Sequence, residues 1–159
     1  MPLYFAYGSN MDIDDLARWC AEKSHPLPAL LNTQPAILKG YRLDFNYYSG
    51  SRKSGAANIM PSASNSVYGL VSEVTEDNLD IISKKEGAPS YYEKITVTLE
   101  TFTGAPLHDV VTFKAAKARE KSSFQPPSRY YLDLILDSAR RHEFPSHYIK
   151  KLELFPCKT

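Results

Sequence analysis

A glutamate near the middle of the chain is a candidate for proton transfer. Glu86 follows Leu79 by seven residues and Ile82 by four, so its carboxylate is expected on the apolar face of a predicted helix. Burial and the negative end of a helix dipole both favour the protonated carboxyl group, and they raise its pKa toward the range that serves a general acid or base. Alternatively, Lys84 and Lys85 mark a solvated helix end from which Glu86 turns outward. The spacing leaves both interpretations open.

A turn near the start of the chain is a candidate for binding an anion. The residues Gly8-Ser9-Asn10 follow a short apolar run, Leu3 to Tyr7, and precede a predicted helix. Successive backbone N–H groups at a helix N-terminus form a partly positive, concave site that suits a carboxylate or a phosphate, and glycine lets a ligand approach the main chain closely. The same residue types are also common in ordinary turns. Both interpretations are open on these residues alone.

Tyrosines form a third group of candidates. The chain has eleven of them, including the doublets Tyr91-Tyr92, just after the glutamate, and Tyr130-Tyr131. A tyrosine hydroxyl near a carboxylate can orient a polar ligand, although packing in a core or on a sheet is the more common role.

A fourth segment is superficially similar to a zinc motif. His142 and His147 are one residue farther apart than the histidines of H-E-x-x-H, and Pro145 disrupts the helix that would place both rings on one face. His25 and His108 have no neighbours of the metal-ligand type. We therefore expect no metal site.

Strands and helices that the sequence pattern also predicts must position these candidates. Strands are expected at 3–7, 41–45, 57–60, 67–74, 95–100 and 111–113. Helices are expected at 13–24, 75–85 and 127–141, and from about 145 or 146 onward. The expected caps are Asp12 and Thr75 at N-termini and Gly87 at a C-terminus. One early helix, neighbouring strands and terminal helices favour a mixed α/β (α+β) fold, with a small curled sheet or barrel and flanking helices.

Composition narrows the class of protein. A chain of 159 residues that is 43% hydrophobic and 12% aromatic can bury a core and is expected to form one domain over 1–159. Its net charge of +1 argues against nucleic acid or an anionic membrane as partner. Two cysteines are too few for a disulfide scaffold, and Cys20 has the helical spacing of a core residue. Without a basic, apolar leader at its start, the chain is expected in the cytoplasm. No nucleotide-binding glycine motif is present, so no nucleotide cofactor is expected.

In chain order, several segments resemble the γ-glutamylcyclotransferase family. They are Leu3 to Met11, Leu43 to Phe45, Ala57 to Pro61, Val67 to Val71, Lys85 to Gly87 and Pro127 to Tyr130. The first of these, with Tyr-Gly-Ser-Asn, is the most specific, and together they span most of the chain.

The resemblance implies a γ-glutamylcyclotransferase-like barrel and a reaction that cyclises a γ-glutamyl amide to 5-oxoproline with release of the free amine. It implies that Glu86 is the catalytic residue. The substrate-binding residues that it implies are Tyr4, Tyr7, Gly8, Ser9, Asn10, Tyr92 and Tyr130. The substrate is then a γ-glutamyl amino acid or a γ-glutamyl-protected amine, handled by a monomer or homodimer without a cofactor. The alternative is a non-catalytic or regulatory protein that binds a carboxylate on the same fold. The segment 115–127 is either a lid over the site or a solvated loop.

Overall fold

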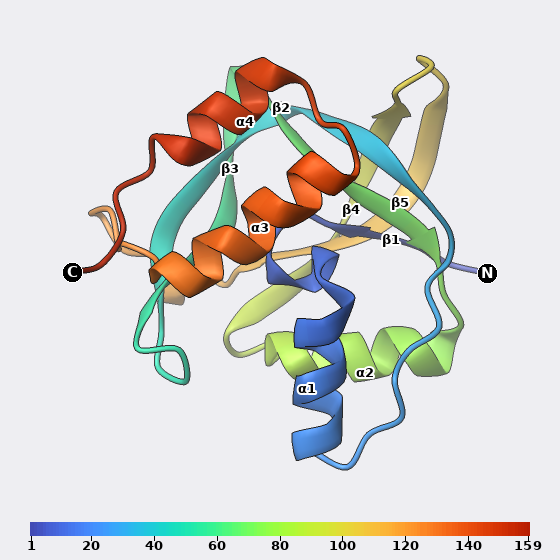
Figure 1. The fold of residues 1–159 in the computed structure, drawn as a ribbon. Coiled ribbons are helices and arrows are strands. Elements are labelled where there is room, and N and C mark those ends of the chain that lie inside the picture. Colours follow the sequence, from blue (N-terminus) through green and yellow to red (C-terminus); the bar gives the residue numbers. More distant parts are fainter.

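Five strands form a closed barrel in the computed structural model, which describes residues 1–159 (Figure 1). The strands are β1 (Leu3–Ala6), β2 (Leu31–Ser49), β3 (Ser54–Glu73), β4 (Tyr92–Thr101) and β5 (Pro106–Ala115). Their order around the barrel is β1-β3-β2-β4-β5. The short β1 closes it, because β1 pairs antiparallel with β3 and parallel with β5. The prediction of a mixed fold with a small barrel is confirmed.

A long hairpin of β2 and β3 makes up much of the barrel wall. Its ladder shifts register at three points, and such bulges bend strands so that a small sheet can close. The strands predicted here were 41–45, 57–60 and 67–74, which left 31–40, 46–49, 54–56 and 61–66 outside them. The run Pro61 to Ser66 is polar and partly exposed, yet both of its ends pair with β2, Pro61 with Tyr41 and Ser66 with Lys39, and the ladder shifts register between them. Pairing between strands, rather than apolar alternation, keeps these residues extended.

Four α-helices flank the barrel: α1 (Ile13–Glu22), α2 (Glu76–Glu86), α3 (Arg129–Arg141) and α4 (Ser146–Glu153). Two short 3₁₀ turns are η1 (Ser9–Met11) and η2 (Lys117–Arg119). The predicted caps are confirmed, since Asp12 and Thr75 each accept a backbone N–H of the first turn, and Gly87 ends α2 in the left-handed conformation with φ 66°. None of the helices has the length and apolar character needed to cross a membrane.

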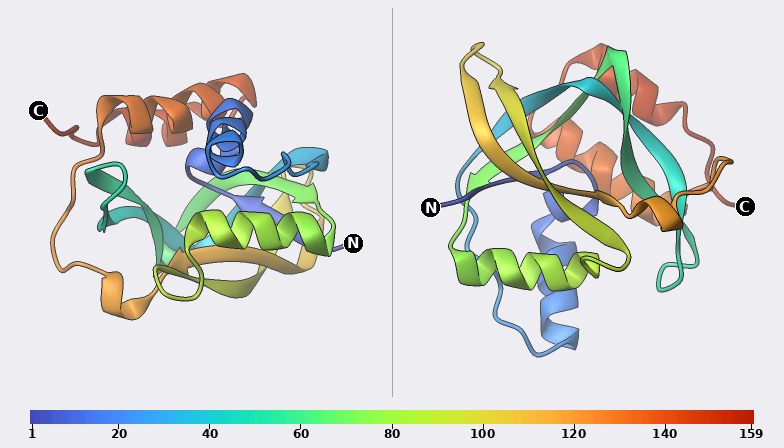
Figure 2. Two further views of the ribbon diagram at one scale, coloured as in Figure 1. Left: turned by 90° about the horizontal axis from the view of Figure 1, so that it is seen from below. Right: turned by 180° about the vertical axis from the view of Figure 1, so that it is seen from behind.

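Helix packing brings the candidate residues to one end of the barrel. Helices α3 and α4 lie together on one side of the barrel, whereas α1 and α2 lie beside each other at its lower end in Figure 1, as the turned views also show (Figure 2). Leu16 and Cys20 of α1 pack against Ile81 of α2 in a small cluster of their own, so the prediction that Cys20 is a core residue is confirmed. Ile13, predicted on the same face, is 43% exposed, because the buried face of α1 begins only at Asp15 and Leu16. The chain leaves β1 through Gly8 and enters η1 beside the C-terminal end of α2.

Candidate active site

Glu86 turns inward at the last position of α2. Its side chain is half-buried, and its Oε1 atom accepts a hydrogen bond of 2.8 Å from the Nδ2 atom of Asn10. The left-handed Gly87 ends the helix directly after it, so the carboxylate lies where the helix dipole is negative. Of the two interpretations of the spacing, the structure therefore shows the inward one.

Opposing influences act on the pKa of Glu86. Desolvation by burial is the largest and raises the pKa above its ordinary value. The positive charges of Lys85 and Arg52 and the hydrogen bond from Asn10 oppose this rise without cancelling it. A carboxyl group of this kind can both take and return a proton more readily than an exposed glutamate.

An inner pocket lies between η1 and the interior of the barrel. It encloses about 330 Å³ of empty space, including some that is open to solvent. Seven of the eight residues predicted for the site line it: Tyr4, Tyr7, Gly8, Ser9, Asn10, Glu86 and Tyr92. They come from β1, the turn that follows it, the end of α2 and the start of β4. The structure therefore brings together segments more than 80 residues apart in the chain.

Buried tyrosine hydroxyls line this pocket. Tyr7 donates to the carbonyl of Phe113 at 2.5 Å, and Tyr92 donates to the carbonyl of Ala57 at 2.7 Å. The Tyr4 hydroxyl accepts from Asn10 at 3.0 Å, which leaves its own proton for another partner. Burial raises the pKa of all three hydroxyl groups, so each is a neutral hydroxyl at physiological pH.

Tyr130 and Tyr131 lie in different places. Tyr130 is 51% exposed, and its hydroxyl accepts from Arg18 at 2.6 Å outside the inner pocket. Tyr131 lines the inner pocket and accepts from the backbone N–H of Ala57 at 3.0 Å. Tyr130 was predicted as a site residue from the sequence, whereas Tyr131 was not. The signal was available in α3, because Tyr131 and the buried Ile135 are four residues apart on one helix face.

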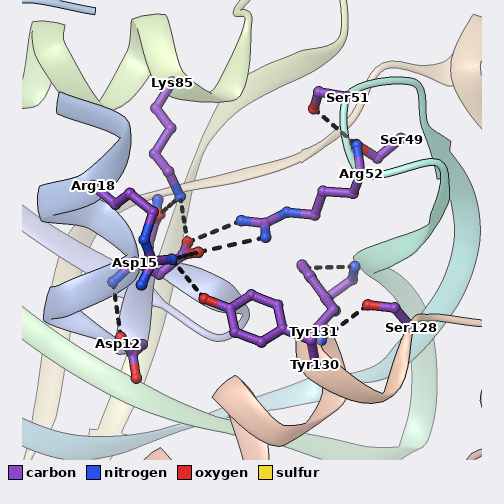
Figure 3. Close-up of polar contacts among 12 residues, drawn as sticks. Asp12, Asp15, Arg18, Ser49, Ser51, Arg52, Lys85, Ser128, Tyr130 and Tyr131 are labelled. Atoms are coloured by element: carbon purple, nitrogen blue, oxygen red, sulfur yellow. Dashed lines mark hydrogen bonds and ion pairs between the residues drawn. The ribbon is translucent and has the colours of Figure 1, made fainter. Parts of the chain in front are cut away.

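A buried cluster of charged groups adjoins the pocket (Figure 3). Asp15 is 6% exposed and pairs with Arg52 at 2.9 Å and with Lys85 at 3.4 Å. Arg18 lies 3.7 Å from the same carboxylate. Asp15, Arg52 and Lys85 were not predicted as part of the site, because residues from α1, the β2–β3 turn and α2 meet only in the folded chain. The Arg52 guanidinium turns inward and lies 4.9 Å from the centre of the Tyr131 ring.

An outer cleft with about 1520 Å³ of empty space, much of it open to solvent, adjoins the inner pocket. The two cavities share Ser9, Glu86, Tyr92 and Tyr131. The carboxylate of Glu86 therefore lies at the boundary between them. Tyr130 and Arg18 belong to the wall of the outer cleft.

The segment 115–127 follows the edge of the barrel. Lys121 donates its backbone N–H to the carbonyl of Asn46 at 2.7 Å, and Gln125 donates to that of Phe45 at 2.6 Å. None of its residues lines either cavity. The segment is held against β2 in this structure rather than closed over the site.

Comparisons with known proteins place the chain in a family. The model of the AIG2-like family matches residues 66–152. The chain is 31% identical to a γ-glutamylcyclotransferase of Bos taurus, over 94% of this chain and 76% of that protein, and 28% identical to one of Mus musculus, over 95% and 77%. A solved structure of a γ-glutamyl cyclotransferase superposes with a TM-score of 0.80 at 27% identity, over 98% of this chain and 88% of that one. The likeness covers both the barrel and the loops that form the two cavities, and the chain therefore belongs to the γ-glutamylcyclotransferase family.

Proposed function

We propose that this protein releases an amine from a γ-glutamyl amide by cyclising the γ-glutamyl group to 5-oxoproline. The observation that carries this proposal is the position of Glu86, an inward-facing carboxylate at the boundary between a small inner pocket and a larger outer cleft. This arrangement suits a substrate whose γ-glutamyl group is constant and fits the small pocket, and whose amine part varies and fits the larger cleft. Family membership supports the same reaction.

The γ-glutamyl group would occupy the inner pocket. The backbone of Gly8 to Asn10 forms part of its wall, and we assign it the substrate's α-carboxylate. Close approach to the main chain depends on Gly8, because a Cβ atom there would lie 3.3 Å from both the Tyr131 hydroxyl and the Cβ of Ala57. Tyr4, with its free hydroxyl proton, is the inner donor best placed to bind a polar atom of the ligand.

Glu86 would transfer protons between the two nitrogen atoms of the substrate. The α-amine attacks the γ-carbonyl only after its ammonium form loses a proton, which the Glu86 carboxylate accepts. Ring closure forms the bond between the α-nitrogen and the γ-carbon and breaks the bond to the leaving nitrogen. The α-nitrogen loses two protons between its ammonium form and the lactam, and the leaving nitrogen gains two when the product amine is an ammonium ion, so the protons balance. Because both reacting groups belong to one molecule, holding it folded provides a large advantage of proximity.

The leaving amine would lie in the outer cleft. This cleft is wider than the inner pocket and contains both charged and aromatic side chains, among them Arg18, Trp19 and Tyr130. We propose a γ-glutamyl amino acid or a γ-glutamyl-protected amine as substrate. The two cysteines are unpaired, which suits a reducing compartment, and we propose that the reaction takes place in the cytoplasm.

The test is release of 5-oxoproline from a panel of γ-glutamyl dipeptides and γ-glutamyl amines. Wild-type protein should release it, and Glu86→Gln should bind the same ligands yet lose about a hundredfold or more in kcat, since the amide cannot exchange the proton. Lys84→Gln, a change at an exposed neighbour on α2, serves as the control and should retain full activity. Binding of γ-glutamyl ligands without any release by the wild type would instead indicate the non-catalytic, carboxylate-binding alternative.

A further inference from the structure

The ammonium group of Lys85 is buried beside the site. Its side chain is only 8% exposed, and it donates a hydrogen bond to the Oδ1 atom of Asn10 while pairing with Asp15 at 3.4 Å. Burial lowers the pKa of Lys85, whereas the charges of Glu86 and Asp15 oppose this and favour the ammonium form. Lys84, the preceding residue of α2, is exposed and forms no side-chain hydrogen bond or salt bridge.

The side chain of Asn10 lies between the ammonium group of Lys85, which can only donate hydrogen bonds, and the carboxyl group of Glu86, which changes its protonation state during the reaction. An amide has a donor end and an acceptor end, and an ammonium group can face only the acceptor end. The Oδ1 atom of Asn10 therefore faces Lys85, and its Nδ2 atom points to Glu86 and to Tyr4. The ionised carboxylate of Glu86 also requires this orientation, because it can only accept. Once Glu86 carries a proton it can donate as well, and it no longer determines which way the amide faces.

We propose that Lys85 is a positioning residue that keeps the Asn10 amide donating to Oε1 of Glu86 throughout the reaction, so that the exchanged proton resides on Oε2. This inference rests on the proposed function of Glu86. Asn10 already donates to Oε1 and so makes that oxygen less basic, whereas Oε2 accepts no hydrogen bond from the protein. Oε2 is therefore the oxygen that we assign to take the proton from the α-ammonium group and to return it to the leaving nitrogen. Fixing the proton on one oxygen aims it at the substrate in both half-reactions.

Asp15 and Arg52 hold Lys85 in place. Burial alone would raise the pKa of Asp15, but the hydrogen bond and charge of Arg52 and the charge of Lys85 hold it below the usual value. Asp15 therefore remains an anion against which the ammonium group is oriented. If Lys85 is replaced, Asp15 still has Arg52 at 2.9 Å, so the substitution leaves no unpaired buried charge and the fold is expected to persist.

Two variants separate orientation from charge. Lys85→Met removes both the donor and the charge, whereas Lys85→Gln removes the charge but retains an N–H₂ donor for Asn10. We expect kcat for 5-oxoproline release to fall about ten- to a hundredfold in Lys85→Met, the size of a lost hydrogen bond to a charged group, and much less in Lys85→Gln. Lys84→Met is the matched control and should equal the wild type.

The pH profile provides a second readout. The charged groups around Glu86 are Lys85 and Arg52, and the neutral titratable groups are Tyr4, Tyr7, Tyr47, Tyr92 and Tyr131. Because the Lys85 cation lowers the pKa of Glu86, both Lys85 variants should move the acidic limb of kcat/KM to higher pH. The limb therefore moves in both variants, but a large loss of kcat is expected only in Lys85→Met. Equal losses in the two variants, or a Lys85→Met enzyme indistinguishable from Lys84→Met, would overturn the inference.

A measurement on the unaltered chain does not depend on turnover or on the folding of a variant. With asparagine side chains labelled with ¹⁵N, the Nδ2 protons of Asn10 should shift in step with the titration of Glu86 and remain one pair of signals across it. Signals that do not respond to this titration, or that split into two orientations at low pH, contradict the inference. If the wild type releases no 5-oxoproline, the proposed reaction is refuted. If the wild type is active but the Asn10 signals do not follow the titration of Glu86 as one pair, only the role of Lys85 is refuted.

Discussion

At the scale of one residue, the raised pKa of Glu86 predicts the acidic side of the activity profile. As a base, Glu86 must be ionised, so kcat/KM should fall as pH drops through its pKa. Burial raises that pKa, and the limb should therefore lie above about 4.3, the value for an unperturbed glutamate. The measurement is the initial rate of 5-oxoproline release against pH at low substrate. Any residual activity of Glu86→Gln should lack this limb, and a limb that persists in that variant would assign it to another group.

The partners of Glu86 could not be predicted from the spacing of the helix. Its position after Leu79 and Ile82 was compatible with an inward carboxylate, and the structure shows one. Asn10, however, lies 76 residues away, and Lys85 acts on Glu86 through the same Asn10 amide. A helical period identifies a buried face but not the groups on other elements that meet it.

The tyrosine doublet gives a paired prediction. Tyr131→Phe removes the acceptor of the buried Ala57 N–H, so it should destabilise the fold by about 1–3 kcal/mol and raise KM for γ-glutamyl substrates. Tyr130→Phe loses only an exposed contact with Arg18 and should unfold at nearly the wild-type temperature. Thermal unfolding and steady-state kinetics of both variants check this. A larger rise in KM for Tyr130→Phe would instead favour the substrate contact that the sequence resemblance assigns to Tyr130.

At the scale of elements, helices were easier to predict than strands. Helix α2 has a side-chain cap at Thr75, an apolar face and a terminal glycine, and these local signals fix both its ends. The hairpin of β2 and β3 lacks such signals over 31–40 and 61–66, where pairs with the opposite strand alternate with shifts of register. Local chemistry determines a helix terminus, whereas a strand depends on a partner elsewhere in the chain.

The glycine after α2 predicts a coupling between helix geometry and catalysis. Gly87→Ala strains a left-handed residue, which costs about 1–2 kcal/mol, and its Cβ atom would lie only 2.7 Å from the Tyr91 ring. The end of α2 must then shift together with Glu86, so we expect kcat to fall. Gly104, at φ 93° in the β4–β5 turn with open space around it, offers the control. Gly104→Ala should lower stability by a similar amount and leave kcat unchanged in the same assays.

At the scale of the whole molecule, charge argues against binding of nucleic acid. The net charge is +1, and the guanidinium group of Arg52 is paired with the buried carboxylate of Asp15. We expect the protein not to bind a fluorescently labelled single-stranded oligonucleotide at low salt, the condition that most favours electrostatic binding. Fluorescence anisotropy, with a basic protein of similar size as positive control, is the measurement. Saturable binding at low salt would show a basic surface that the folded chain does not otherwise indicate.

Closure of the barrel by β1 has a consequence for biosynthesis. This strand emerges from the ribosome before its partners, which lie at 54–73 and 106–115. Until β3 and β5 have been synthesised, the turn after β1 lacks the barrel wall that completes the inner pocket. Tyr131, which also lines that pocket, is synthesised later still. Pairing between segments so distant in sequence is slow and leaves apolar strands exposed meanwhile. A nascent chain therefore has to keep β1 soluble and unpaired, and it gains its active site only after α3 has been synthesised.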